Sequence, residues 1–192
     1  MQPSANPVPW VAVATAPAKV CRGNTTLLAG GSVSLTQGLT GPGSLTVNAT
    51  AATVSGTFAT AGDQQYLAPV SVVGDTVFNA SAANISFAGD LLATSVGDTV
   101  TVETSGTASF GGAIGNGSSA ATTFFSGFTV GSGNAQLAGN VVALSQTYNA
   151  DLALLNNVTF AGLSGAFNGG VDGQNNAVTL GLTRAGWPAL LR

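Results

Sequence analysis

The sequence contains no histidine and only one cysteine, Cys21, in 192 residues. A single cysteine cannot form an internal disulfide, so the chain has no disulfide framework. Without histidine, histidine-assisted nucleophilic catalysis and the usual zinc sites are excluded. We therefore interpret Cys21 as an unpaired residue of an N-terminal flank, and we predict no zinc centre.

Charge is also scarce, because charged residues make up 6% of the sequence against roughly 25% in an average soluble domain. All seven acidic residues lie between residues 23 and 183, where no basic residue occurs. The basic residues lie near the two ends: Lys19, Arg22, Arg184 and Arg192. Binding to nucleic acids or to anionic membranes depends on basic side chains. We predict no nucleic-acid partner and no direct membrane insertion.

Aromatic residues are few, at 7%, whereas apolar residues reach 45%. Disordered segments combine low hydrophobicity with high net charge, but here the mean hydropathy is +0.39 and the net charge is −3. We therefore predict a folded chain with thin layers of small apolar residues. We expect the core to include Val72, Ile85, Phe87, Phe110 and Phe160.

Composition divides the chain into three parts. Residues 1–22 hold four of the seven prolines and are interpreted as an N-terminal flank or cap. Residues 23–183 form the body, and residues 184–192 a C-terminal tail or cap. Each end segment carries one tryptophan, Trp10 or Trp187, which we expect to cap the end or to dock a partner.

Short segments in which every second residue is apolar recur through the body. They are rich in Val, Ile, Thr and Phe and are bounded by Gly, Asn and Asp, which is typical of short β-strands. The clearest are residues 33–36, 45–48, 70–72, 85–87, 100–103, 128–130, 158–160 and 178–180. This pattern predicts an all-β fold without a long helix.

An internal repeat distinguishes a stacked solenoid from an antiparallel sandwich. Residues 64–78 align with residues 146–160 without a gap. The alignment pairs Gln64 with Gln146, Tyr66 with Tyr148 and Phe78 with Phe160. Repeated strand-and-turn units favour a solenoid, in which like side chains stack about 4.8 Å apart and uncharged residues are favoured. We predict that paired residues occupy equivalent places on their turns.

An ordered series of motifs resembles the filamentous-haemagglutinin-like repeats of large bacterial surface adhesins. The series consists of GDQQYLAPVSVVGDTVF, NISFAGDLLATSVGDTVTVETSGTASFGGAIGN, FTVGSGNAQLAGN and SQTYNADLALLNNVTFAG. The resemblance covers about residues 26–181. It implies a right-handed parallel β-helix, a single elongated domain at the bacterial outer surface or released from it. It also implies a non-enzymatic structural or adhesive role.

Two other functions stay open. A self-assembling filament subunit would stack end to end, because solenoid ends expose unpaired strands. A carbohydrate-active β-helix enzyme would need paired carboxylates, and the best candidate is Asp75 with Asp98 or Glu103. No basic residue of the body could stabilise negative charge in a transition state, so we predict no catalytic residue and no enzymatic activity.

We interpret the aspartates instead as turn residues, so replacing Asp75 or Asp98 with Asn should cost little stability. Gly-Asp pairs recur at 62–63, 74–75, 89–90 and 97–98. They lack the nonapeptide period of calcium-binding repeats, so we predict no metal ion and no cofactor.

Aromatic residues are the remaining candidates for ligand binding. Phe124 and Phe125 belong to the densest aromatic cluster, and Tyr66 and Tyr148 recur in the repeat. Their rings could face a sugar ligand or pack in the core. The partners expected are a host-cell or surface carbohydrate or protein, or further copies of the chain.

Overall fold

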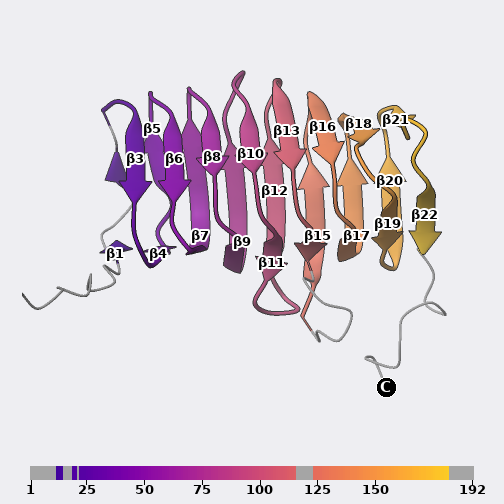
Figure 1. Cartoon of the computed structure of the whole chain (residues 1–192), viewed down its shortest axis with the longest axis horizontal. Helices are drawn as coiled ribbons and strands as arrows, with labels where there is room; N and C mark the ends of the chain where they lie inside the picture. Colours follow the sequence, from indigo (N-terminus) through magenta and orange to yellow (C-terminus); the bar gives the residue numbers. More distant parts are fainter. Residues whose placement is uncertain (1–11, 15–18, 21, 116–122, 182–192) are drawn as a thin grey trace, which may run out of the picture.

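The structure is a computed structural model that describes residues 12–14, 19–20, 22–115 and 123–181. In this part of the chain every regular element is a β-strand, and neighbouring strands run parallel. The chain winds through about eight turns, and strands of successive turns lie side by side along the long axis (Figure 1). The predicted all-β solenoid is confirmed.

Each turn crosses three faces, which we name by their strands. The first face is an eight-stranded sheet. Its strands are β3 (Thr25–Leu28), β6 (Leu45–Asn48), β8 (Gln64–Tyr66), β10 (Ile85–Phe87), β13 (Thr107–Phe110), β16 (Asn134–Leu137), β18 (Asp151–Leu154) and β21 (Val171–Asp172).

The second and third faces are two parts of one 14-stranded sheet. Three long strands cross from the second face to the third: β7 (Ala51–Thr60), β9 (Val70–Asn79) and β17 (Val141–Tyr148). The second face also contains β1 (Ala12–Ala14), β4 (Ser32–Leu35), β11 (Leu91–Ala93), β14 (Ile114–Gly115), β19 (Val158–Ala161) and β22 (Val178–Gly181). The third face also contains β2 (Lys19–Val20), β5 (Leu39–Gly41), β12 (Thr99–Glu103), β15 (Phe125–Val130) and β20 (Ser164–Phe167).

In two of the three long strands, a glycine lies where the strand turns from the second face to the third. Gly56 in β7 and Gly74 in β9 have φ values of 89° and 78°. This left-handed region is accessible to glycine at no steric cost, because glycine lacks a Cβ atom. The register between β7 and β9 shifts at the same place, between Val54 and Gly56. In β7 and β9 the corner between the two faces is therefore formed at a glycine, whereas β17 turns the corner without one.

Inward side chains form columns along the axis, because alternate residues of each strand point to opposite sides. One column of the first face consists of Leu27, Val47, Tyr66, Phe87, Phe110, Leu137 and Leu154. In it the ring centroids of Tyr66 and Phe87 lie 5.0 Å apart, and those of Phe87 and Phe110 5.4 Å apart. The five residues expected in the core are all buried, which confirms that prediction.

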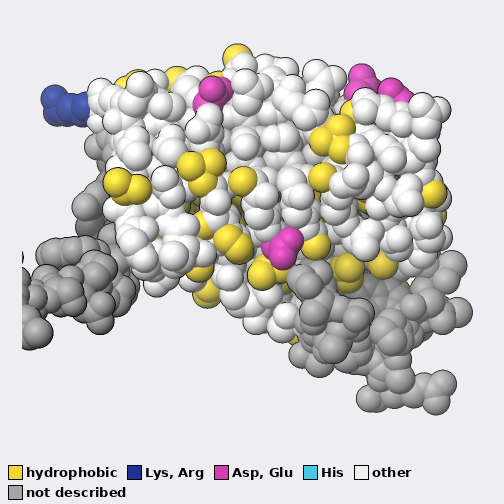
Figure 2. All heavy atoms as spheres, viewed as in Figure 1, with side chains coloured by type: hydrophobic (Ala, Val, Ile, Leu, Met, Phe, Trp, Pro, Cys, Tyr) yellow, Lys and Arg dark blue, Asp and Glu magenta, His cyan; other side chains and the backbone are white. Residues whose placement is uncertain are grey.

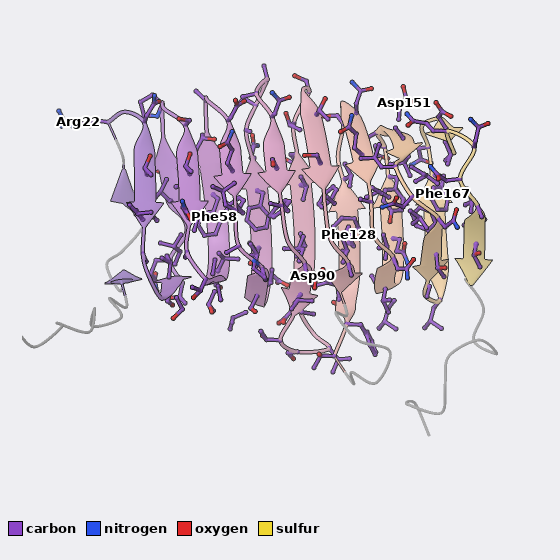
Figure 3. The ribbon with its side chains drawn as sticks, viewed as in Figure 1. Arg22, Phe58, Asp90, Phe128, Asp151 and Phe167 are labelled. Carbon is purple, nitrogen blue, oxygen red and sulfur yellow. The ribbon has the colours of Figure 1, made fainter. Side chains whose placement is uncertain are left out.

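Aromatic rings also stack on the third face. Phe58 stacks on Phe78 with ring centroids 5.5 Å apart, and Tyr148 stacks on Phe167 at 5.0 Å. Figure 3 shows Phe58 and Phe167 near opposite ends of the stack, with Phe128 between them. Rings of different faces meet edge to face, as Tyr66 and Phe78 do at 5.2 Å. The core is therefore a continuous aromatic and aliphatic stack.

Two short strands of the solenoid lie in the N-terminal segment of the chain. Strands β1 and β2 lie within residues 1–22, the segment interpreted as a flank or cap. They pair in parallel with β4 and β5. The described part of the predicted N-terminal flank or cap therefore adds two short strands to the stack. Trp10 and Trp187 lie outside the described residues.

The predicted equivalence of the two aligned segments is wrong. Tyr66 lies on the first face and Tyr148 on the third, whereas Phe78 lies on the third face and Phe160 on the second. The aligned segments are thus displaced by one face around the turn. All four rings nevertheless point inward and are fully buried. Because each face needs the same alternation of core and surface residues, a sequence that suits one face also suits another.

Candidate functional site

The aromatic candidates for ligand binding lie in the core. Tyr66, Tyr148 and Phe125 are 0% exposed, and Phe124 is 3% exposed. These rings therefore do not face a ligand, and core packing is the alternative that the structure shows. Sequence alternation could not separate the two, because a sugar-stacking ring and a core ring can both occupy an apolar position of a strand.

The Gln-x-Tyr motif forms a buried polar pair. The hydroxyl of Tyr66 donates to Oε1 of Gln64 at 3.1 Å. Nε2 of Gln64 donates to the backbone carbonyls of Phe58 at 2.9 Å and Asn79 at 2.8 Å. Gln64 is 0% exposed, so these bonds satisfy polar atoms that water does not reach. The motif therefore ties the first face to the C-terminal parts of β7 and β9 on the third face.

The second copy of the motif makes the same kind of bonds on another face. The hydroxyl of Tyr148 donates to Oε1 of Gln146 at 3.0 Å, and Nε2 of Gln146 donates to the carbonyl of Ala161 at 2.8 Å. Burial raises the pKa of both tyrosines well above the ordinary value of 10.0. The repeat seen in the sequence is therefore a structural module, and its function is to satisfy buried polar groups.

Asp98, one of the candidate carboxylates, is bound by backbone N–H groups. It is 4% exposed. Its Oδ1 accepts the N–H of Gly74 at 2.8 Å, and its Oδ2 accepts those of Thr94 at 3.0 Å and Ser95 at 2.8 Å. These contacts close the loop after β11 and attach it to β9 of the preceding turn. This carboxylate therefore has a structural role.

The other two candidate carboxylates, Asp75 and Glu103, do not lie next to each other. Oδ1 of Asp75 accepts the hydroxyl of Thr99 at 2.6 Å. Glu103 lies four residues further along the strand from Thr99, which places the two strand positions roughly 13 Å apart. The carboxyl pairs of glycosidases lie roughly 5 to 9.5 Å apart. The structure therefore separates Asp75 from Glu103, whereas Asp75 and Asp98 belong to adjacent dipeptides on neighbouring turns and each accepts hydrogen bonds from other residues.

Other Asp and Asn side chains bind the backbone of the next turn. Oδ1 of Asp63 accepts the N–H of Asn84 at 2.8 Å, and Oδ1 of Asp90 accepts that of Ala113 at 2.8 Å. The same contact is made by Asn24, Asn84, Asn140, Asp151 and Asn157. Figure 3 labels Asp90 and Asp151 at two corners of the solenoid. The turn role predicted for aspartates thus extends across turns and includes asparagines.

Within the described residues, no group of three or more His, Cys, Asp or Glu side chains could hold a metal ion. The same residues form no helix long and apolar enough to cross a membrane. Figure 2 shows an outer surface that is mostly neutral, with scattered hydrophobic side chains and few acidic ones. A ligand that binds most of this surface would therefore contact uncharged polar groups.

The described surface includes two shallow concavities. One lies where the third face meets the turn that follows it, and is lined by Asn79, Ser81, Glu103, Thr104, Ser105, Gly131 and Ser132. The other lies on the first face near the C-terminal end, and is lined by Thr107, Asn134, Ala135, Gln136, Asp151, Leu152, Ala153 and Asp172. Each spans several turns, so sequence motifs did not reveal either.

Comparisons with protein-family models, with curated proteins and with solved structures each find no match for this chain. The resemblance to filamentous-haemagglutinin-like repeats therefore stays a hypothesis based on the sequence motifs.

Proposed function

We propose that this chain is a non-enzymatic structural module of an extracellular or outer-surface bacterial protein, where it forms part of a rod that presents an adhesive surface. The observation that carries the proposal is the uninterrupted stack of about eight turns with one continuous core. A repeating stack transmits position and rigidity along its axis, because each turn contacts its neighbours.

The contacts of the acidic residues support a structural role. Asp63, Asp90, Asp98 and Asp151 each accept a backbone N–H of an adjacent turn. A carboxylate engaged in this way holds turns together and is a poor candidate for proton transfer. The extracellular location rests on the sequence resemblance and on the low charge of the chain.

One observation favours the alternative of a filament subunit. The last described turn exposes three apolar side chains, Val171 at 45%, Val178 at 43% and Leu180 at 58%. Val171 and Leu180 continue the inward columns of Leu152 and Phe160. Among the described strands, none pairs with the outer edge of β21 or β22. A further turn of solenoid, supplied by a second copy, would cover this end.

Two measurements on the purified chain test these proposals. Negative-stain electron microscopy with light scattering should show short single particles for the structural module, and filaments would favour the alternative. Beads coated with the chain should then adhere to target cells more strongly than beads coated with a Val72→Asp variant, in which a buried charge disrupts the core. Equal adhesion would contradict the adhesive role. Release of reducing sugars from polysaccharides would contradict the non-enzymatic one.

A further inference from the structure

An outward column on the third face is interrupted by a glycine. The column consists of Ala59, Asn79, Glu103, Gly131, Asn149 and Asn168. On one side of Gly131, Nδ2 of Asn79 donates to Oε2 of Glu103 at 3.3 Å. On the other side, Nδ2 of Asn168 donates to Oδ1 of Asn149 at 2.7 Å. Gly131 offers no side chain to join the two pairs.

The missing side chain leaves the concavity between Glu103 and the next turn. Two strand spacings, about 10 Å, separate the backbone positions of Glu103 and Asn149. A Cβ atom at Gly131 would lie 3.1 Å from Cγ of Glu103, so any side chain at this position would enter the hollow. Gly131 and Glu103 line the hollow together with the serine-rich turn that follows the third face.

The hollow has more free acceptors than donors. Among the described residues, no hydrogen bond engages Oε1 of Glu103 or the hydroxyl of Ser81. Ser105 and Ser132 donate their hydroxyl hydrogens to the carbonyls of Ser81 at 3.3 Å and Thr104 at 3.1 Å, so their oxygens remain acceptors. A matching ligand must therefore present several donors close together.

Ser81 holds a backbone conformation that is rare for a residue with a side chain. Its φ is 50°, in the left-handed region. The conformation is held because the N–H of Ser81 donates to Oδ1 of Asn79 at 2.8 Å and its carbonyl accepts the N–H of Ser105 at 2.8 Å. Such conformations persist only where the surrounding contacts enforce them, and they are frequent at binding sites.

The charge of the hollow further restricts the class of ligand that could bind there. Glu103 is the only charged residue that lines the hollow, and no Lys or Arg occurs between residues 23 and 183. An anionic ligand would face an unpaired carboxylate. A calcium ion needs six to eight oxygen ligands, usually from several carboxylates, and this site has one. A neutral group with adjacent hydroxyls fits both the charge and the surplus of acceptors.

We propose that this hollow binds one pyranose ring of a neutral polysaccharide. Adjacent ring hydroxyls donate to the carboxylate of Glu103, and further hydroxyls bond to Ser81 and Ser132. No aromatic ring lines the site, so binding by one chain is weak, and many copies on one surface supply avidity. This inference deepens the proposed adhesive function and rests on it for its biological meaning.

The test is a solution NMR titration of the labelled chain with methyl mannoside, cellotetraose and the N-acetylglucosamine trimer as neutral probes. We expect at least one of them to shift the amide signals of Gly131, Ser81 and Ser105 at millimolar concentration. Trigalacturonate and calcium chloride serve as anionic and metal probes and should leave these signals unchanged. Absence of shifts with every neutral probe overturns the proposal, and so do shifts caused by the anionic or metal probe alone.

Two variants locate the binding. Gly131→Asn places in the hollow the residue found at position 149 of the same column, and it should abolish the shifts while the melting temperature is kept. Glu103→Gln retains the acceptor for Asn79 but loses the charge, and it should weaken binding roughly five- to tenfold. The matched control Ala153→Asn fills the other concavity and should leave binding unchanged. Binding that survives in Gly131→Asn contradicts the assignment of the site.

The bead assay separates this inference from the proposed function. If Gly131→Asn beads adhere as the unaltered chain does, the adhesive function stands and the saccharide site is wrong. If the unaltered chain binds a neutral saccharide in solution but its beads do not adhere, the site stands and the adhesive function is wrong.

Discussion

Asp98 binds Gly74 of the preceding turn of the solenoid, with Oδ1 of the carboxylate accepting the backbone N–H at 2.8 Å. The residues that follow these two in the chain, Asp75 and Thr99, form a second bond, in which the donor lies on the other turn. The hydroxyl of Thr99 donates to Asp75 at 2.6 Å. The dipeptides Gly74-Asp75 and Asp98-Thr99 therefore join two neighbouring turns by one hydrogen bond in each direction, an arrangement that we call the clamp. One half of the clamp is buried and the other exposed, so the two aspartates make unequal contributions to stability.

Replacement of Asp98 with Asn should lower the free energy of unfolding by about 1–3 kcal/mol. The carboxylate accepts three backbone N–H groups, and an amide would turn an NH₂ donor toward at least one of them. This revises the sequence-based expectation of a small cost. Asp75→Asn is the matched control and should change stability by less than about 0.5 kcal/mol, since its bond is exposed. Urea denaturation of both variants checks this, and equal costs would contradict it.

Gln64→Met and Gln146→Met should destabilise the chain by similar amounts, about 1–3 kcal/mol each. Each substitution keeps side-chain length but leaves a buried tyrosine hydroxyl and a backbone carbonyl without their partner. Thermal unfolding followed by circular dichroism measures the loss. If Gln65→Met, on the outward side of the same strand, costs as much as Gln64→Met, the buried bonds are not the cause.

Truncation of the stacked rings should be costly throughout the solenoid. Phe87→Ala and Phe110→Ala should each lower stability by about 3–5 kcal/mol, because both side chains are almost fully buried and stack on each other. Leu28→Ala is the control, since Leu28 is 79% exposed and should cost less than about 0.5 kcal/mol. Denaturant titration gives these values, and a small cost at Phe110 would disprove the continuous core.

Strand alternation was enough to predict the fold class and the inward residues. Val72 and Phe110 are buried because each occupies an apolar position of a period-two segment. The face on which a strand lies could not be predicted, because turn lengths vary and all faces share one alternation. Tyr66 and Tyr148 therefore align in sequence but lie on different faces.

The candidate site depends on neighbours that only stacking reveals. Gly131 is one of 27 glycines, and nothing in its local sequence distinguishes it. Its importance comes from Glu103 and Asn149, which the register places on the turns before and after it. The reciprocal bonds of Asp98 were missed for the same reason, because Gly74 lies on another turn. An exact register would have been needed to find either feature.

Alkaline pH should unfold the chain through its two tyrosines. The chain contains only Tyr66 and Tyr148, and burial raises the pKa of both above 10.0. Because the folded-state pKa is the higher one, their contribution to stability is complete below about pH 10, the pKa of an exposed tyrosine. It is lost as the pH rises from there through the raised pKa. Each tyrosine should then reduce the free energy of unfolding by about 1.4 kcal/mol per pH unit.

Two signals recorded in one alkaline titration check this prediction. Tyrosinate absorbance should rise only together with the loss of the β-sheet circular dichroism signal, since the phenols ionise when the core opens. A variant with Tyr66→Phe and Tyr148→Phe is the control. It loses both titrating groups but keeps both rings, so its stability should fall less steeply above about pH 10. Tyrosinate that forms while the sheet signal is intact would mean that the phenols reach solvent in the folded chain, and the buried Gln-Tyr pairs would then be wrong.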